Sequence, residues 1–298
     1  MKAIETIRLT KYYGKARGIA DISLSVEEGD FFGFIGPNGA GKSTTIRTLL
    51  GLITATDGSA RIFGRDIQTQ KTTLLGEIGY LPSETMFYHG MRVKDVLRLS
   101  ADLHKKDCRE ETKKLCHRLD LDVSRKIDEL SLGNRKKVGI VCAMQHKPRL
   151  YILDEPTSGL DPLMQREFYA LLQERSRAGA TVFLSSHILS EVQRYCRHAA
   201  VIREGRILVT DSVEKLGHTG AKRVTLRGVD KAPALPHIRD IETLPDTVSF
   251  LYSGEAGVLL NSLASLPITD VTIAEPDLEE VFLHYYREEE ENNDHFQA

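Results

Sequence analysis

Residues 36–43 read Gly36-Pro37-Asn38-Gly39-Ala40-Gly41-Lys42-Ser43 and match the pattern GxxxxGK[ST]. Glycines at these spacings let the backbone curl so that several N–H groups converge on phosphate oxygens. Lys42 adds a positive charge for the β- and γ-phosphates, and the Ser43 hydroxyl is a ligand for Mg²⁺. The alternative is a chance match in a glycine-rich turn, which a random chain of this length would contain roughly one time in a hundred. The stretch therefore predicts a loop that binds a nucleoside triphosphate.

The segments on either side of this loop fit that interpretation. Phe31 to Ile35 is a short and almost entirely apolar run, which predicts a strand buried on both faces. Ser43 to Leu50 is predicted as a helix, with Gly51 as its cap. The N-terminal end of such a helix carries positive partial charge and would point at the same anion.

A second apolar run, Leu150 to Leu153, ends in the acids Asp154 and Glu155. Acids at the carboxyl end of a parallel strand face the crevice in which such sheets bind ligands. Asp154 is expected to hold Mg²⁺ through water, and Glu155 to orient or deprotonate the attacking water. The alternative is a strand followed by a solvated acidic turn. The presence of a phosphate loop in the same chain favours the metal-binding interpretation over this alternative.

Strands and helices alternate through the first two thirds of the chain. Residues 4–35 contain short alternating strands, and Thr181 to Leu184 is another apolar run of strand length. A predicted helix from Pro162 to Ala178 separates that run from the acidic strand. This order predicts an α/β fold with a parallel sheet.

Residues 84–135 differ in character, because they are rich in charged residues and apolar positions are sparse. Helical spacing puts the apolar side chains on two faces, one of Val93, Val96, Leu97 and Leu103 and the other of Leu115 and Leu119. The region is predicted to be a small helical subdomain.

The joint pattern resembles the ATP-binding-cassette (ABC) ATPase superfamily. Leu130-Ser131-Leu132-Gly133-Asn134 is similar to its LSGGQ signature, and Ser158-Gly159-Leu160-Asp161 is similar to its D-loop. Ser185-Ser186-His187 resembles the switch histidine loop, and Tyr13 resembles the aromatic residue that stacks on adenine. The resemblance covers about residues 3–212, with the motifs in family order.

The resemblance implies a P-loop NTPase cassette with a RecA-like parallel core, an antiparallel β subdomain and a helical signature subdomain. It also implies an ATPase that uses ATP and Mg²⁺, and two cassettes that pair head to tail so that each signature serine meets the γ-phosphate held by the other. From the residues alone, Ser131 is an N-cap candidate for a helix that includes Val138, Val141 and Met144. A plain helix cap is the alternative role for Ser131.

The resemblance assigns a role to each motif residue. His187 is expected to sense the γ-phosphate. For both His187 and Tyr13, the alternative role is ordinary packing. The expected catalytic residues are Glu155 and His187, and the expected Mg²⁺ residues are Ser43 and Asp154. The expected nucleotide-binding residues are Tyr13, Gly36, Pro37, Asn38, Gly39, Ala40, Gly41, Lys42, Ser43 and Thr44. Ser131, Gly133 and Asn134 are expected to act in trans, with Asp161 in the D-loop.

Two departures from the family pattern stand out. The signature carries Leu132 and Asn134 where the family has Gly and Gln, although Ser131 and Gly133 remain. Ser83 occupies the place of the Q-loop glutamine and is too short to reach a metal ion as that glutamine does. We expect that water fills the gap, or that Glu84 reaches in, and that turnover is slow.

Residues 1–212 are thus expected to form the nucleotide-binding domain and residues 213–298 a small α+β accessory domain, whose acidic tail at Glu288 to Glu291 is expected to be frayed. The stretch Glu275 to Phe282 resembles the EPxLEEVF ending of ATPases from bacterial ABC-2-type exporters of drugs, antibiotics and peptides. An ordinary amphipathic helix would give a similar string.

Composition limits the partners. The net charge of −2 gives no basic field for nucleic acid, and no run of 18 apolar residues could span a bilayer. The resemblance implies the partners: a polytopic ABC-2-type membrane permease, which is expected to dock on Met91 to Leu121 at the cytoplasmic face, and a second cassette, identical or related. The four cysteines are expected to be reduced thiols.

Other function classes fit less well. Cohesion and DNA-repair ATPases insert long coiled coils between phosphate loop and signature, and here that span is short and lacks heptads. A regulatory module without hydrolysis is disfavoured by the intact Glu155 and His187. A soluble single-cassette ATPase of cofactor assembly is the strongest alternative to a transporter subunit. The transported molecule and its direction are not readable from the chain.

Overall fold

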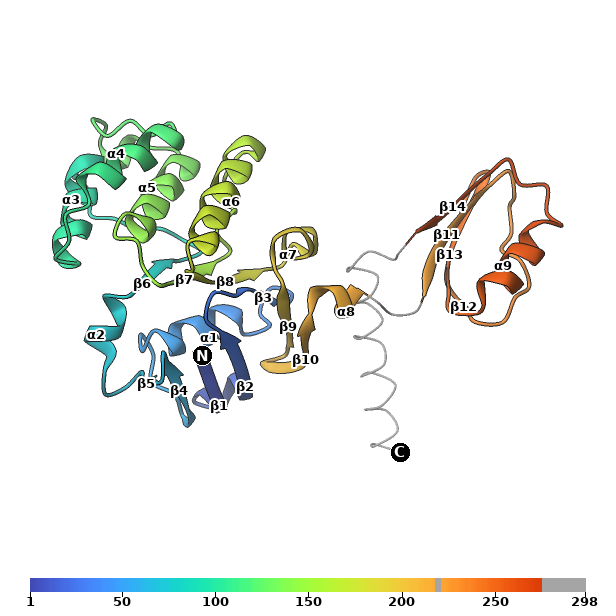
Figure 1. Ribbon diagram of the computed structural model, residues 1–298, viewed down its shortest axis with the longest axis horizontal. Coiled ribbons are helices and arrows are strands. Elements are labelled where there is room, and N and C mark those ends of the chain that lie inside the picture. The colour runs from blue at the N-terminus through green and yellow to red at the C-terminus, as the bar shows by residue number, and fades with distance from the viewer. Residues whose placement is uncertain (218–220, 275–298) are drawn as a thin grey trace. The chain divides into compact units, whose positions relative to one another are not determined.

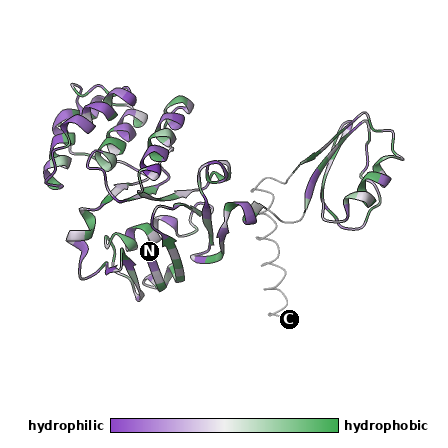
Figure 2. Ribbon diagram, viewed as in Figure 1, coloured by the Kyte–Doolittle hydropathy of each residue, from purple (hydrophilic) through white to green (hydrophobic). Residues whose placement is uncertain are grey.

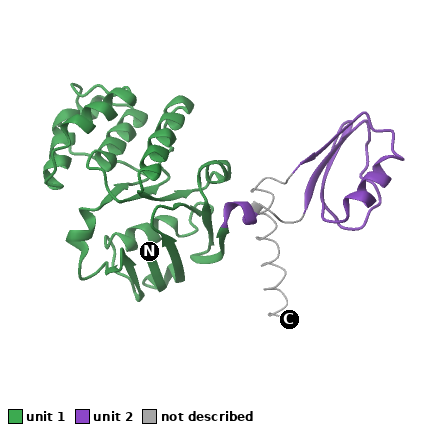
Figure 3. Cartoon of the chain, in the orientation of Figure 1, with its two compact units in different colours: residues 1–211 green, residues 212–298 purple. Residues whose placement is uncertain are grey.

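The computed structural model describes residues 1–217 and 221–274 (Figure 1). The chain divides into two compact units, Met1–Asp211 and Ser212–Ala298, which Figure 3 colours separately. All four cysteines lie in the first unit and are free thiols, as the sequence predicts. No helix in the described ranges has the length and apolarity needed to cross a membrane.

A six-stranded sheet forms the centre of the first unit, in the order β10-β9-β3-β8-β7-β6. The neighbouring pairs β9/β3, β3/β8, β8/β7 and β7/β6 are all parallel, which confirms the predicted parallel core. Every residue of β3, β7 and β8 is buried, which explains their continuous apolar runs. The strands are β3 (Phe31–Ile35), β6 (Ile78–Leu81), β7 (Leu150–Asp154), β8 (Thr181–Ser186), β9 (His198–Arg203) and β10 (Arg206–Ser212).

Three helices follow strands of this sheet. Helix α1 (Lys42–Leu49) begins with the last two residues of the phosphate loop. Both of its ends lie one residue earlier in the chain than predicted. Helix α6 (Pro162–Arg177) ends one residue earlier than predicted, and α7 (Leu189–Tyr195) follows β8. Aromatic contacts join the strands, because the Phe34 and Phe183 ring centroids lie 5.4 Å apart.

An antiparallel sheet in the order β2-β1-β4-β5 packs on the same core. Strands β1 (Lys2–Tyr13) and β2 (Ala16–Glu27) form a long hairpin, as the alternation in residues 4–35 predicts. Strands β4 (Asp57–Ile62) and β5 (Arg65–Asp66) and the short helix α2 (Lys71–Leu75) were not predicted. One hydrophobic cluster contains Ile4 and Ile22 together with Phe34 and Ile152, so the two sheets share a core.

Helices α3 (Val93–Leu103), α4 (Arg109–Arg118) and α5 (Leu132–Met144) gather on the opposite side of the central sheet (Figure 1). A short 3₁₀ turn, Ile127–Glu129, leads into α5. Figure 2 shows mostly hydrophilic residues on α4, whereas α3 carries apolar and charged residues in turn. Val93, Val96 and Leu97 are buried, whereas Leu103, the last residue of α3, is 75% exposed.

The second unit has its own small α+β architecture. Its antiparallel sheet runs β12-β13-β11-β14, and Val224 and Phe250 lie in a hydrophobic core of its own beside α9. The predicted exporter-like stretch at Glu275 to Phe282 and the acidic tail lie outside the described residues. The elements are α8 (Val213–Gly217), β11 (Lys222–Arg227), β12 (Ile238–Leu244), β13 (Thr247–Tyr252), α9 (Ala256–Leu263) and β14 (Asp270–Ala274).

Candidate ATP site

The predicted phosphate loop connects β3 to α1, and two of its glycines cannot be replaced without a clash. Gly41 has φ 108°, and a Cβ there would lie 2.8 Å from Ile19 Cγ2 and 3.0 Å from the Gly18 oxygen. At Gly36 a Cβ would lie 2.2 Å from the Ile202 oxygen. The loop is therefore held against two neighbouring strands in the tightly curled form that exposes its N–H groups.

Lys42 lies folded over this loop with only 4% of its surface exposed. Its Nζ donates hydrogen bonds to the oxygens of Gly36 (2.7 Å) and Pro37 (3.0 Å) and lies 3.3 Å from Glu155 Oε1. The ammonium thus already occupies the concave side of the loop, where a phosphate would compete with the carboxylate of Glu155 for its charge.

Glu155 is the meeting point of three segments. Its carboxylate lies 3.3 Å from Lys42 Nζ and 3.3 Å from His187 Nδ1. Its N–H lies 3.2 Å from both the backbone oxygen and the hydroxyl of Ser185, and its φ of 46° places it in the left-handed region. The ends of β3, β7 and β8 therefore bring the phosphate-loop lysine, the acid and the histidine together, as adjacent parallel strands should.

Asp154 is fully buried, and its carboxylate is only half satisfied. Oδ1 accepts a hydrogen bond from the Ser185 hydroxyl at 2.7 Å. Oδ2 is buried and has no hydrogen-bond partner among the described residues, an arrangement that is costly for a charged oxygen. Such an orphaned oxygen fits a water molecule that binds Mg²⁺, and the partly exposed Ser43 hydroxyl supplies the second oxygen ligand.

Ser131 caps α5, as predicted, because its hydroxyl accepts a hydrogen bond from the Asn134 N–H at 3.3 Å. Gly133 lies against the D-loop, since a Cβ there would sit 2.7 Å from the Gly159 oxygen. Asp161 caps α6 by accepting from the Met164 N–H at 3.0 Å, a structural role that was not predicted. Ser131 and Asp161 are both exposed, so the signature and the D-loop form one accessible surface.

Tyr13 ends β1 and is 49% exposed. An added Cβ at Gly18 would meet Tyr13 Cε2 at 2.9 Å and Thr44 Cγ2 at 3.1 Å, so the ring lies beside the start of α1. Lys11 Nζ lies 5.3 Å from the ring centroid, and the 49% exposure of Tyr13 leaves part of its surface open to solvent. The geometry suits a flat ligand stacked next to the phosphate loop.

Comparisons with known proteins agree with this geometry. The family profile described as "ABC transporter" matches residues 19–158. The bacitracin transport ATP-binding protein BcrA of Bacillus licheniformis is 34% identical over 297 residues, which cover 94% of this chain and 96% of that protein. The chain belongs to the ABC transporter ATP-binding proteins. A second BcrA, from Enterococcus faecalis, is 30% identical and is covered over 94% of both chains.

Solved structures place the fold in the same family. A structure of an ATP-binding subunit of an ABC transporter aligns with a TM-score of 0.68 at 30% identity, over 72% of this chain and 91% of that one. The ADP conformation of the ABC transporter cassette MJ1267 aligns with a TM-score of 0.61 at 26% identity, over 72% of this chain and 94% of that one. This ABC protein is therefore an ATPase that uses ATP and Mg²⁺, pairs with a second cassette and works with a separate membrane subunit.

The Q-loop position of this ABC protein shows a feature that the sequence reasoning missed. The backbone oxygen of Ser83 accepts a hydrogen bond from Lys136 Nζ at 2.8 Å. Burial lowers the pKa of Lys136 to about 8, although the nearby carboxylates of Asp154 and Glu155 oppose the shift. Glu84 is exposed and makes no hydrogen bond or ion pair within the described part of the chain, so nothing indicates that it reaches in. Nothing in the sequence sets Lys136 apart, because it lies in the polar run Asn134 to Lys137 at the start of α5.

Proposed function

We propose that this ABC ATPase drives the export of a peptide antibiotic, or a drug of similar chemistry, through an ABC-2-type permease at the cytoplasmic face of the membrane. End-to-end similarity to two bacitracin transport proteins carries this proposal. Their similarity spans 94% of the chain, more than the cassette alone could supply, and it favours transport over cofactor assembly.

The proposed chemistry uses the contacts around Glu155. When the phosphate loop holds ATP, Lys42 turns from Glu155 to the β- and γ-phosphates, which frees the carboxylate to accept a proton from the attacking water. His187 stays beside the carboxylate and senses the γ-phosphate. Asp154, through water, and Ser43 would hold Mg²⁺, which would supply positive charge to the phosphate oxygens. Tyr13 stacks on adenine.

A second cassette completes this site. Each chain has one phosphate loop but two helix N-termini suited to an anion, at α1 and at the Ser131-capped α5. We assign the signature residues, exposed Ser131 and partly exposed Gly133 and Asn134, to the γ-phosphate of the partner cassette. Asp161, which is exposed beside it, would lie in the same interface.

Transport is tested by expressing the chain together with a candidate ABC-2-type permease in a peptide-antibiotic-sensitive host. The inhibitory concentration of bacitracin should rise for the parent and stay at the host's value for Glu155→Gln. Protection against other compound classes only would contradict the peptide-antibiotic proposal while leaving the transporter assignment in place.

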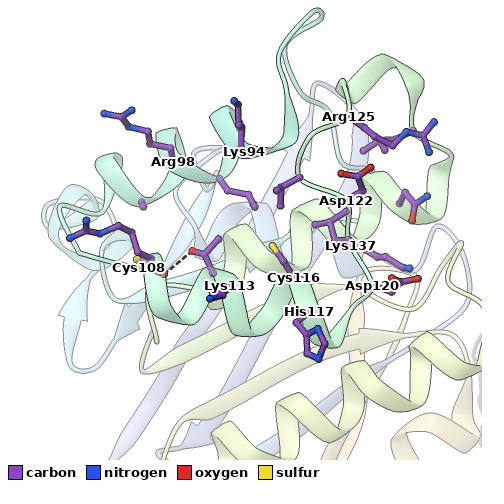
Figure 4. A pocket seen from close by; sticks show the side chains of 18 of the residues that line it. Lys94, Arg98, Cys108, Lys113, Cys116, His117, Asp120, Asp122, Arg125 and Lys137 are labelled. Carbon is purple, nitrogen blue, oxygen red and sulfur yellow. Dashed lines mark hydrogen bonds between the residues drawn. The ribbon is translucent and has the colours of Figure 1, made fainter.

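The permease docks, in this proposal, on the helical subdomain. A groove of about 1460 Å³ runs between α3, α4 and α5, and Figure 4 shows its lining. Lys94 and Lys113 line it, and Lys137, which is only 9% exposed, has no ion-pair partner among the described residues. Leu103, the last residue of α3, does not line the groove but leaves an apolar side chain 75% exposed on the same helix. This combination suits an amphipathic segment of the permease that carries acidic residues.

Charge reversal tests this docking surface. The double substitution Lys94→Glu and Lys113→Glu should abolish co-purification with the permease while the chain's own affinity for ATP stays at the parent value. Arg61→Glu, an exposed change on β4, is the matched control and should leave co-purification intact. If the double variant co-purifies with the permease as well as the parent does, the groove is not the docking site.

Ser83 at the Q-loop position leads to a separate prediction. We propose that contact with Mg²⁺ here runs through water and that turnover is slow as a result. Ser83→Gln should therefore lower the Mg²⁺ concentration needed for half-maximal hydrolysis and raise turnover, as measured by phosphate release across a Mg²⁺ titration. If neither quantity changes, the shortened side chain has no effect on metal contact.

A further inference from the structure

Lys136 is a buried lysine at the junction of three segments of the ATP site. Only 2% of its surface is exposed. Its Nζ donates to the backbone oxygens of Pro82 (3.1 Å), Ser83 (2.8 Å) and Glu155 (3.1 Å). An ammonium group has three N–H donors, so these three oxygens satisfy it completely.

The fold explains why these oxygens converge. Strands β6 and β7 are parallel neighbours with Leu81 opposite Leu153, so the chain leaves both strands at the same edge. Helix α5 lies close to this edge, because a Cβ at Gly79 would sit 2.1 Å from the Ala143 oxygen and one at Gly139 would sit 2.9 Å from Leu81 Cδ1. Lys136 lies one turn before Gly139 and reaches along that contact to both strand ends.

We propose that Lys136 is a positioning residue of the ATPase reaction, which ties the signature helix to the peptide of Glu155 and to the Q-loop position at Ser83. The proposal rests on the proposed role of Glu155 as the base. It goes beyond the motif assignments, since none of them includes this lysine.

The backbone of Glu155 is held in place by hydrogen bonds at both its N–H and its carbonyl oxygen. Its φ of 46° is unfavourable for a residue with a side chain, so the surroundings must impose it. Ser185 binds the N–H of Glu155, and Lys136 binds its carbonyl oxygen. Without the Lys136 ammonium, the backbone of Glu155 is held only at its N–H. The carboxylate is then free to move away from Lys42 and His187.

The test compares Lys136→Met, which keeps the length of the side chain but has no donors, with Lys136→Arg, which keeps the donors. In the purified full chain, Lys136→Met should lower kcat at least about tenfold while KM for Mg-ATP changes by no more than about twofold, because Lys136 does not touch the phosphate loop. Lys136→Arg should recover most of the lost turnover. A kcat for Lys136→Met equal to that of the parent overturns the proposal.

Lys71→Met is the matched control, because Lys71 Nζ donates to the Gly51 oxygen at 2.6 Å outside the site. It should lose stability without losing kcat. If Lys136→Met does not fold in a thermal-unfolding assay, Lys136→Gln is measured in its place against the same expectation.

A double-mutant cycle with Glu155→Gln separates this inference from the assignment of the base. If Lys136 acts through Glu155, Lys136→Met should cause no further loss of turnover in the Glu155→Gln background. An equal loss in both backgrounds overturns the positioning role. Parent-like turnover of Glu155→Gln alone would instead remove the proposed base, and the kcat of Lys136→Met in the parent background would still decide whether Lys136 supports the reaction.

Discussion

A Glu155→Gln variant should hydrolyse ATP roughly 10²- to 10⁴-fold more slowly than the parent, the usual contribution of a positioned general base. The amide has nearly the shape of the carboxylate, so the contacts at the end of β7 are retained. Removing the negative charge 3.3 Å from Lys42 also removes its competitor for phosphate, so affinity for Mg-ATP should be unchanged or higher. Phosphate release and equilibrium binding of a fluorescent ATP analogue measure the two effects.

Glu5→Gln is the control for this change. Glu5 also pairs with a lysine, Lys2, but lies on β1 at the surface of the antiparallel sheet. Its substitution should alter neither turnover nor affinity. Parent-like hydrolysis by Glu155→Gln would rule out Glu155 as the base and leave His187 as the remaining candidate at this point of the site.

Gly41→Ala should destabilise the chain by about 2 to 5 kcal/mol, from the left-handed backbone and the close contacts together. The Cβ would meet Ile19 Cγ2 at 2.8 Å and the Gly18 oxygen at 3.0 Å, and Gly41 has φ 108°. Since relief requires the phosphate loop to move, ATP binding should be lost even where the protein remains folded. Chemical denaturation and the binding assay above report the two losses separately.

Gly29→Ala isolates the backbone contribution. Gly29 has φ 76°, but a Cβ there would have no atom within 4 Å. The substitution should cost only about 1 to 2 kcal/mol and leave ATP binding intact. Equal losses for the two alanine variants would show that the close contacts at Gly41 are not what holds the loop.

The central strands were predictable because their signals are local. Burial on both faces produces unbroken apolar runs such as Phe31–Ile35, and that signal fixed β3, β7 and β8 to within two residues. Strand β4, by contrast, contains Asp57, Gly58 and Ser59, and it is a strand because it pairs with β1. Pairing between distant segments leaves little trace in a short polar stretch.

The same distinction applies to the site. Lys42, Glu155 and His187 could be grouped from sequence because each follows a recognisable strand. In the structure, Lys42 Nζ and His187 Nδ1 each lie 3.3 Å from the Glu155 carboxylate. Lys136 could not be found this way, because lysines are almost always exposed. Its three acceptors are backbone oxygens, which look the same in every residue, and only the fold brings them together.

The position of Lys136 has a consequence for a pair of cassettes. Lys136 lies on the helix that Ser131 caps, and in a head-to-tail pair Ser131 would face the nucleotide of the neighbour, whereas in the proposed mechanism Glu155 would serve the nucleotide of its own chain. The Lys136 ammonium would then couple the two nucleotide sites. Nucleotide binding at one site would change the position of Glu155 at the other. Thermodynamic linkage makes this coupling mutual, so the two ATP sites would not bind nucleotide independently of each other.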